Sequence, residues 1–193
     1  MEQKEEPKTI IFTGNSNNGK TKLLYRVCED SFLDEYSVTS MEFKDRLFEK
    51  NSFSSGNINP VTIRFYDIAG QEDFGCIQEA FYSVANIVFV CCPVNNVAEL
   101  QFTREKILPV VQFFKEEHCK IFLLATKSDL EENISVEFNQ KVQEIKNEYD
   151  INYFVTSAKK GTGCEEVMKK AMRCLVDCEK NEKPKKVSFC CCF

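Results

Sequence analysis

The chain has 193 residues, of which 43% are hydrophobic and 12% aromatic, and this composition excludes a low-complexity disordered protein. Its length is that of one domain with its own core. The 25 Lys and Arg residues against 30 Asp and Glu give a formal net charge of −5. This charge excludes nonspecific binding to nucleic acid, because such binding needs an excess of positive side chains.

Short apolar runs alternate along the chain with longer segments of helical period, which predicts an α/β domain. Strands are expected at residues 9–13, 41–48, 61–68, 86–92, 120–125 and 153–156. Helices are expected at residues 20–29, 72–82, 97–117, 136–149 and 165–179. This alternation favours a mostly parallel six-stranded sheet with helices on both faces. Ligands bind such a sheet beyond the carboxyl ends of its strands.

Composition divides the chain into three parts. Residues 1–8 are charged and form an N-terminal extension without a secretory signal. Residues 9–179 form the domain, and residues 180–193 form a polar, lysine-rich tail. No stretch approaches the roughly 18 apolar residues of a transmembrane helix. Without an export signal we expect a reducing compartment, in which the cysteines outside the tail are free thiols in packing roles.

A phosphate-binding loop is the first motif with a chemical role. Residues 14–21 read Gly-Asn-Ser-Asn-Asn-Gly-Lys-Thr, directly between a predicted strand and a predicted helix. This satisfies G-x-x-x-x-G-K-[ST] in its required context, so a P-loop NTPase fold is expected. The N–H groups of the loop can surround phosphate oxygens at the positive end of the helix. Lys20 is expected to reach the β- and γ-phosphates, and the Thr21 hydroxyl to bind Mg²⁺.

Two later segments predict which base is bound. Thr126-Lys127-Ser128-Asp129 follows an apolar strand, and a carboxylate there can accept from both N1–H and the N2 amine of guanine. The stem of Lys127 can lie across the base plane. Ser157-Ala158-Lys159 follows the last strand, where the Ala158 N–H can donate to guanine O6. Guanine is therefore the expected base.

The sequence resembles the Ras-superfamily small GTPases. Asp67-Ile68-Ala69-Gly70-Gln71-Glu72 resembles the D-x-A-G-Q-E switch element, and Phe32 with Tyr36-Ser37-Val38-Thr39 resembles the first switch. With the loop and the two guanine segments these motifs stand in the order of the family, over about residues 9–179. The resemblance implies a switch between GTP and GDP, with Mg²⁺ as cofactor, that hydrolyses GTP.

The resemblance also implies roles for single residues. Gln71 positions the attacking water and acts in catalysis with Lys20. Thr21, Thr39 and, through a water, Asp67 hold Mg²⁺. The N–H groups of Thr39 and Gly70 contact the γ-phosphate, so hydrolysis releases both switches. Phe32 either packs edge-on against the base or belongs to the core. The implied nucleotide-binding residues are Asn15, Ser16, Asn17, Asn18, Gly19, Lys20, Thr21, Lys22, Phe32, Tyr36, Thr39, Gly70, Thr126, Lys127, Asp129, Leu130, Ser157, Ala158 and Lys159.

Three positions depart from the family pattern. Ser16 stands where glycine is usual, and its side chain would crowd the space above the γ-phosphate, so we expect slow hydrolysis. Thr126 replaces the usual asparagine, as in the Rho branch, yet the interval from Asp129 to Ser157 is too short for the extra helix of that branch. An atypical Rho/Ras-like member is therefore expected. Residues 51–60 make a long loop, and the effector segment 40–48 has an unusual sequence.

The tail predicts attachment to a membrane. Cys190-Cys191-Cys192-Phe193 fits C-a-a-X, which indicates geranylgeranylation of Cys190. A Rab-type C-C-x-x ending, with lipids on two cysteines, is the alternative. Upstream basic side chains supply a second signal for an anionic surface, namely Lys183, Lys185 and Lys186. We expect a lipid-anchored protein on the cytoplasmic face of the plasma membrane or an endomembrane.

The expected partners are an exchange factor, a GTPase-activating protein, effectors, a prenyltransferase and a GDI-type chaperone, with no nucleic acid. A scaffold locked with GTP and a P-loop phosphotransferase are the rival functions. The phosphotransferase leaves the two guanine segments and the cysteine tail unexplained.

Overall fold

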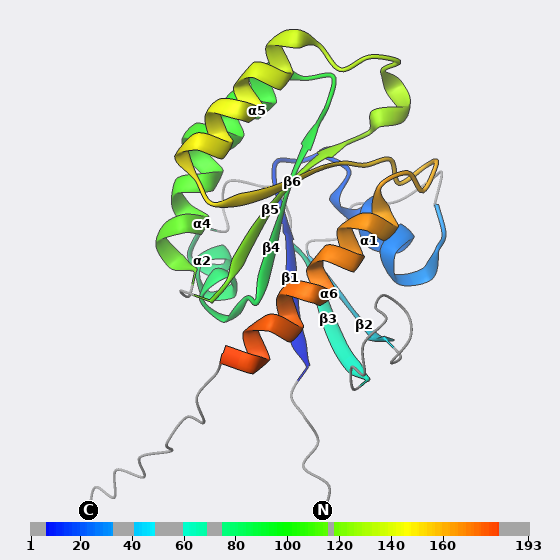
Figure 1. The fold of residues 1–193 in the computed structure, drawn as a ribbon, viewed down its shortest axis with the longest axis vertical. Helices are drawn as coiled ribbons and strands as arrows, with labels where there is room; N and C mark the ends of the chain where they lie inside the picture. Colours follow the sequence, from blue (N-terminus) through cyan, green and yellow to red (C-terminus); the bar gives the residue numbers. More distant parts are fainter. Residues whose placement is uncertain (1–6, 33–40, 49–59, 69–74, 116–117, 182–193) are drawn as a thin grey trace, which may run out of the picture.

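Six strands form one sheet in the order β2-β3-β1-β4-β5-β6 (Figure 1). The computed structural model describes residues 7–32, 41–48, 60–68, 75–115 and 118–181. The strands are β1 Lys8–Thr13, β2 Met41–Phe48, β3 Val61–Ile68, β4 Ile87–Pro93, β5 Lys120–Thr126 and β6 Ile151–Val155. Strand β2 pairs antiparallel with β3, and every other neighbouring pair is parallel. The predicted fold class is confirmed.

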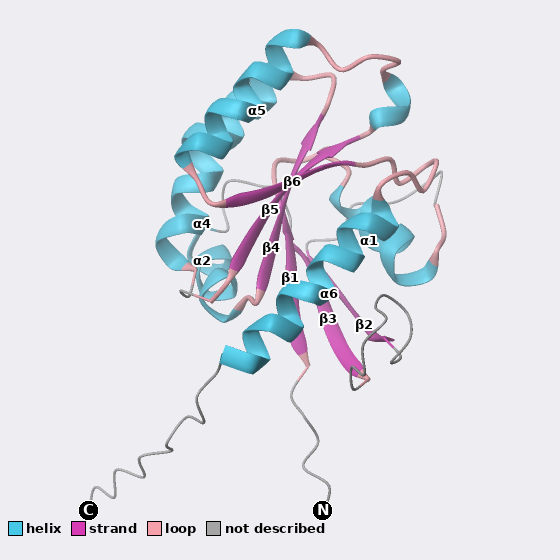
Figure 2. Cartoon of the chain, viewed as in Figure 1, coloured by secondary structure: helices cyan, strands magenta, loops and turns pink. Residues whose placement is uncertain are grey.

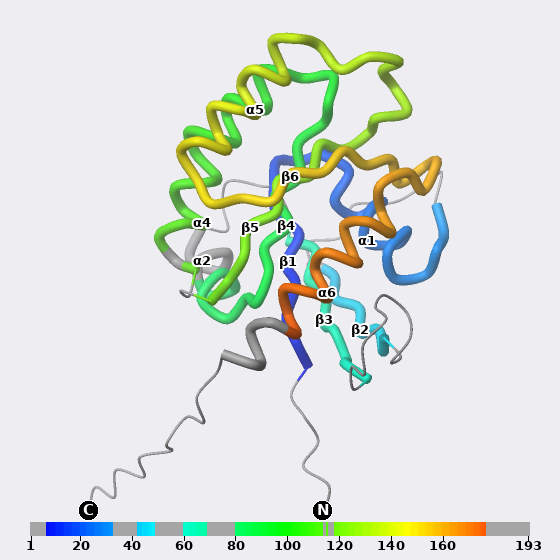
Figure 3. The backbone as a smooth tube through the Cα atoms, in the orientation of Figure 1, coloured from blue at the N-terminus to red at the C-terminus, as the bar shows by residue number. Residues whose placement is uncertain are grey.

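Helices cover both faces of the sheet (Figure 1). On one face lie α1 Lys20–Glu29 and α6 Cys164–Asn181, drawn side by side in blue and orange in Figure 3. On the other face lie α2 Gly75–Val84, α3 Val97–Phe102, α4 Leu108–Phe114 and α5 Val136–Glu148. The expected start of α2, residues 72–74, lies outside the described residues.

The core has two layers because successive strand residues point to opposite faces. Ile10 and Phe12 of β1 pack in the layer under α1 and α6, while Ile11 packs in the layer under α2 to α5. Helix α6 buries one apolar side in the first layer, at Val167, Met168, Ala171, Met172 and Leu175. This packing fixes α1, and therefore the loop that precedes it, against the sheet.

The helical stretch expected at residues 97–117 is helical from Val97 to Phe114, but it is not one regular α-helix. The chain forms α3, then a π-helical turn at Thr103–Ile107, then α4, which ends at Phe114. Pro109 has no N–H to donate and lies in the first turn of α4, so regular α-helical bonding is not possible through this point. The Leu108 N–H instead bonds to the carbonyl of Thr103, five residues back.

The carboxyl ends of the parallel strands lie at one edge of the sheet. Figure 2 draws the loops that follow β1, β5 and β6 toward α1. A short 3-10 turn, η3 Ser128–Leu130, follows β5. The three motifs that the sequence places after these strands are thereby brought together, as expected for an open α/β sheet.

The cysteines whose side chains the structure describes are thiols and not disulfides, in packing positions, as predicted. Cys91, Cys92, Cys119 and Cys164 are buried, and Cys28 is half-buried. Burial raises the pKa of the Cys91 thiol to about 12. Among the described helices, none has the length and hydropathy of a membrane span.

Candidate nucleotide site

The loop between β1 and α1 contains residues in the left-handed region, where glycine is favoured. Gly14 and Gly19 have φ values of 134° and 83°, and Asn17 has a φ of 63°. A β-carbon at Gly14 would lie 2.5 Å from the carbonyl oxygen of Cys91, so only glycine fits where β1 passes β4. Gly19 is the left-handed residue from which α1 starts. The loop therefore ends at the N-terminus of a helix, which favours anions.

Lys20 lies across this loop. Its side-chain Nζ donates to the carbonyls of Gly14 and Asn15, at 2.8 Å each. The side chain is buried, and this burial lowers the pKa of the ammonium, although the charges of Asp67 and Glu99 act in the opposite direction. An anion in the loop would restore the preference of Lys20 for its charged form.

The hydroxyl of Thr21 donates to Oδ2 of Asp67, at the end of β3. The other carboxylate oxygen, Oδ1, is buried and has no hydrogen-bond partner among the described residues. Burial raises the pKa of Asp67, against the opposing effects of Thr21 and Lys20. A hydroxyl beside an unpartnered carboxylate oxygen suits a hard cation or its water, so these two residues fit the expected Mg²⁺.

The side chains of the loop are held by three other elements. Asn18 is buried and donates through Nδ2 to the Cys91 carbonyl and to Oε1 of Glu99, both at 2.9 Å. Asn15 donates to Oε2 of the same Glu99 at 3.3 Å. The hydroxyl of Thr126 donates to the Asn18 carbonyl at 2.7 Å. Thr126 thus fastens the phosphate loop to the end of β5.

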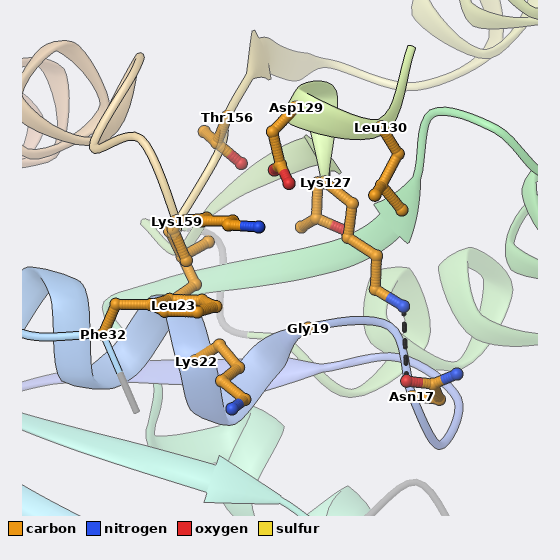
Figure 4. A pocket seen from close by; sticks show the side chains of 12 residues that line it. Asn17, Gly19, Lys22, Leu23, Phe32, Lys127, Asp129, Leu130, Thr156 and Lys159 are labelled. Atoms are coloured by element: carbon orange, nitrogen blue, oxygen red, sulfur yellow. Dashed lines mark hydrogen bonds between the residues drawn. The ribbon is translucent and has the colours of Figure 1, made fainter. Parts of the chain in front are cut away.

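A cavity of about 360 Å³ opens beside the loop, where β5, β6 and α1 meet (Figure 4). It is lined by Asn17, Gly19, Lys22, Leu23, Phe32, Thr126, Lys127, Asp129, Leu130, Thr156, Ala158 and Lys159. Both predicted guanine segments therefore reach one cavity. Its size is in the range of small-ligand sites.

Asp129 is aimed by its neighbours. The Ser157 hydroxyl donates to Asp129 Oδ1 at 2.6 Å, and that hydroxyl in turn accepts from the Lys160 N–H at 3.0 Å. Figure 4 shows the Asp129 carboxylate pointing into the cavity between Lys127 and Lys159. Lys127, with a φ of 59°, extends along the wall and donates to Asn17 Oδ1 at 3.2 Å. The Ser157 hydroxyl therefore orients the Asp129 carboxylate and occupies one lone pair of its Oδ1.

Arg26 of α1 holds the loop that follows β6. Its guanidinium donates to the carbonyl of Ala158 at 2.7 Å and to that of Lys159 at 3.3 Å. A second pair of bonds reaches the backbone carbonyl and the carboxylate of Asp30. The N–H of Ala158 is thereby held beside the cavity.

Phe32 lines the cavity, where the Lys22 ammonium lies 4.9 Å from its ring centre. This location favours the predicted contact with a base over a place in the core. Several predicted site residues lie outside the described residues, namely Tyr36, Thr39, Gly70, Gln71 and Cys190, with the tail lysines Lys183, Lys185 and Lys186. Leu23, Arg26, Glu99 and Thr156 join the site without having been predicted.

The chain belongs to the Ras family, because the model of that family matches residues 9–177. Proteins of this family are small GTPases that bind GTP and GDP and typically Mg²⁺. The chain is 30% identical to Ras-related protein Rab-36 of Mus musculus over 154 residues, which are 79% of this chain and 55% of that protein. It is 30% identical to Ras-related protein Rab-34 of Mus musculus over 146 residues, 72% of this chain and 54% of that protein.

Ras-related protein RAB1BV of Beta vulgaris is 30% identical over 159 residues, 82% of this chain and 71% of that protein. The matched part of the chain spans about half the length of the two mouse relatives. The expected membership of the Ras superfamily is confirmed. These relatives carry Rab names, and they do not support the expected Rho/Ras-like branch.

Proposed function

We propose that the chain is a molecular switch that binds GTP and GDP and hydrolyses GTP to GDP and phosphate. The observation that carries the proposal is the position of Asp129, held by Ser157 at 2.6 Å in a cavity that borders the phosphate loop. A carboxylate there complements the N1–H and N2 amine of guanine, and adenine presents no matching donors. The loop and Lys20 suit the phosphates of the same ligand.

For hydrolysis we propose the roles that the family resemblance implies. Gln71 orients the attacking water, and Lys20 with the loop N–H groups stabilises the charge that develops on the phosphates. Thr21, Thr39 and, through a water, Asp67 hold Mg²⁺, and the unpartnered Oδ1 of Asp67 supports this assignment. When bound, Mg²⁺ neutralises charge on the β- and γ-phosphates.

We further propose that turnover is slow. Ser16 is exposed at the outer turn of the loop, beside the left-handed Asn17. Its side chain would occupy space needed by Gln71 and by an arginine from an activating protein. A protein biased towards GTP follows, and in the limit of negligible hydrolysis it would be a scaffold that binds effectors while GTP is bound.

Effectors, an exchange factor and an activating protein are the partners we propose. The surface of β2 and β3 supports an effector contact, because Phe43 is 60% exposed and lies 6.1 Å from the ring of Tyr66. Tyr66 in turn packs 4.9 Å from Phe81 of α2. Aromatic side chains of this kind are enriched at protein interfaces. The Rab names of the relatives favour a Rab-like switch.

Membrane attachment is proposed from the tail, residues 180–193. Cys190 would carry one lipid in a C-a-a-X ending, or Cys190 and Cys191 would carry two in a Rab-type ending. A prenyltransferase is then a required partner, and we propose a GDI-type chaperone as a further one. The mass of the C-terminal peptide from cells separates the one-lipid and two-lipid endings, and an unmodified Cys190–Phe193 contradicts both.

Base specificity tests the proposed function. Nucleotide-free protein is loaded with a fluorescent GDP derivative and challenged with GTP or ATP, in wild type and in Asp129→Ala. We expect GTP to compete about 10–100-fold better than ATP, because one paired acceptor contributes that much discrimination. Asp129→Ala should lose most of this preference, whereas Asp150→Ala, in the exposed turn between α5 and β6, should retain it. Equal competition by ATP contradicts the proposal.

A further inference from the structure

Glu99 is a charged side chain that lies against the phosphate loop, although no nucleotide-binding motif includes it. It stands in the first turn of α3, where its N–H donates to the side chain of the helix-capping Asn96 at 2.9 Å. The cap fixes the backbone from which the half-buried Glu99 side chain extends. Its carboxylate is therefore presented to the loop from a rigid element.

Both carboxylate oxygens of Glu99 are used on the loop. Oε1 accepts from Asn18 at 2.9 Å and Oε2 accepts from Asn15 at 3.3 Å. The two asparagines flank Ser16 and Asn17, which form the outer turn of the loop. The Glu99 side chain thus bridges the two ends of this outer turn. Glu99 lies 84 positions after Asn15 in the sequence.

The loop needs such support because its backbone is in a costly conformation. Asn17 has a φ of 63°, which a residue with a β-carbon adopts only at a cost. The N–H groups of a phosphate loop bind an anion only while they converge on one point. Bonds to charged acceptors are stronger than neutral ones, and a carboxylate that bridges two loop residues opposes their separation.

We propose that Glu99 is a positioning residue of the phosphate loop: by bridging Asn15 and Asn18 it holds the loop closed and slows the release of bound nucleotide. This inference rests on the proposed nucleotide binding. It assigns to α3 a part in setting how long the switch keeps its nucleotide.

A carboxylate near phosphates also has an opposite effect, because like charges repel. The two effects predict opposite outcomes for the removal of the side chain. Loss of the bridge speeds release, and loss of the charge alone slows it. The variant Glu99→Gln separates the effect of the bridge from the effect of the charge. The new amide oxygen still accepts from Asn18. The new NH₂ group can donate to the Asn15 side-chain oxygen once the Asn15 amide rotates by half a turn.

The experiment uses the full chain loaded with a fluorescent GDP derivative and Mg²⁺, and measures its dissociation rate in excess GDP. We expect Glu99→Ala to release the probe about tenfold faster, since two bonds to a charged acceptor are lost. Glu99→Gln should stay within about threefold of wild type. Asn15→Ala should speed release less than Glu99→Ala does, and should add nothing when combined with it.

Two controls separate positioning from stability. Glu105→Ala removes an exposed glutamate of the neighbouring π-helical turn that bonds Gln101. Val142→Ala lowers stability by truncating a buried residue of α5, away from the loop. Neither should change the dissociation rate beyond twofold. If the loss of stability in Val142→Ala is accompanied by faster dissociation of the GDP derivative, the inference is overturned.

Further outcomes overturn it as well. If Glu99→Ala releases the probe at the wild-type rate, the bridge made by Glu99 does not slow release. Slower release from both Glu99→Ala and Glu99→Gln assigns the effect of Glu99 to charge repulsion. Additive effects of Asn15→Ala and Glu99→Ala would show that the two residues are not coupled. A wild-type chain that holds no GDP derivative would refute the proposed function itself, which distinguishes the two failures.

Discussion

Thr13 and Tyr82 share a hydrogen bond of 2.7 Å that joins the last residue of β1 to α2. Both side chains are buried, and Tyr82 is the largest fully buried side chain among the described residues. Thr13 directly precedes Gly14 of the phosphate loop, and α2 directly follows the segment that resembles the second switch. The bond therefore ties the helix after that switch to the start of the loop.

The first prediction concerns this bond. Tyr82→Phe removes one partner and leaves the buried Thr13 hydroxyl unpaired, which should lower the free energy of unfolding by about 1–3 kcal/mol. Denaturant unfolding of the nucleotide-free protein measures the change. The double variant Thr13→Val, Tyr82→Phe replaces both partners by apolar groups and should recover most of the loss. An unchanged single variant would show that the bond contributes nothing.

The second prediction concerns Ser16. Ser16→Gly clears the space above the γ-phosphate, so single-turnover hydrolysis of GTP with an activating protein should rise by at least about tenfold. The rate without the activating protein should rise less, because only Gln71 then uses the space. Equal rates for serine and glycine in both arms contradict the proposed slow turnover.

The third prediction concerns removal of Mg²⁺. Asp67→Asn keeps an oxygen that accepts from Thr21 but loses the charge of the carboxylate, so Mg²⁺ affinity should fall by about 10–100-fold. The measure is the Mg²⁺ concentration that halves the release rate of a fluorescent GDP derivative. Chelation should speed release from wild type and have little further effect on the variant. The same Mg²⁺ dependence in wild type and Asp67→Asn would exclude this residue from the metal site.

The fourth prediction concerns pH. Burial raises the pKa of the Cys28 thiol from 9.0 to about 12, although Arg46 and Lys44 act in the opposite direction. Only the thiolate reacts with iodoacetamide, so labelling of Cys28 in the native protein should rise about tenfold per pH unit from pH 7 to 10. Mass spectrometry measures the labelling rate at each pH. The labelling rate of a thiol with an ordinary pKa would level off near pH 9, and such a plateau for Cys28 contradicts the prediction.

The same pKa shift has a consequence for stability. The folded protein binds the Cys28 proton more tightly than the unfolded chain does. The stabilisation is therefore complete below pH 9 and is lost as the pH rises from 9 towards 12. Cys28→Ala should weaken the decline in unfolding free energy over this range.

The sheet and most of its helices were predictable because their signals are local. An apolar run such as residues 121–124 indicates a strand buried on both faces without knowledge of any other segment. The phosphate loop and the two guanine segments were predictable for the same reason, since each is contiguous and follows a strand. The π-helical turn at Thr103–Ile107 was not predicted, although Pro109 was a signal for it, because the helical period of the segment continues through this point.

The support of the site was not predictable, because it depends on contacts between distant residues. Glu99 and Arg26 occupy ordinary helical positions, and their bonds to the loops exist only once the sheet has formed. Thr126 was predicted to bind nucleotide, yet its hydroxyl bonds the Asn18 carbonyl. Spacing along the chain does not indicate which atom a side chain will reach.

We propose that the cavity between the phosphate loop, Asp129 and Ala158 holds a guanine nucleotide. The most direct measurement is the identity of the nucleotide that copurifies with the protein, separated by chromatography after denaturation. We expect GDP and GTP together at close to one per chain, with a raised proportion of GTP because Ser16 slows hydrolysis. Adenine nucleotides in their place, or chains without nucleotide that also fail to bind added GTP, would contradict it.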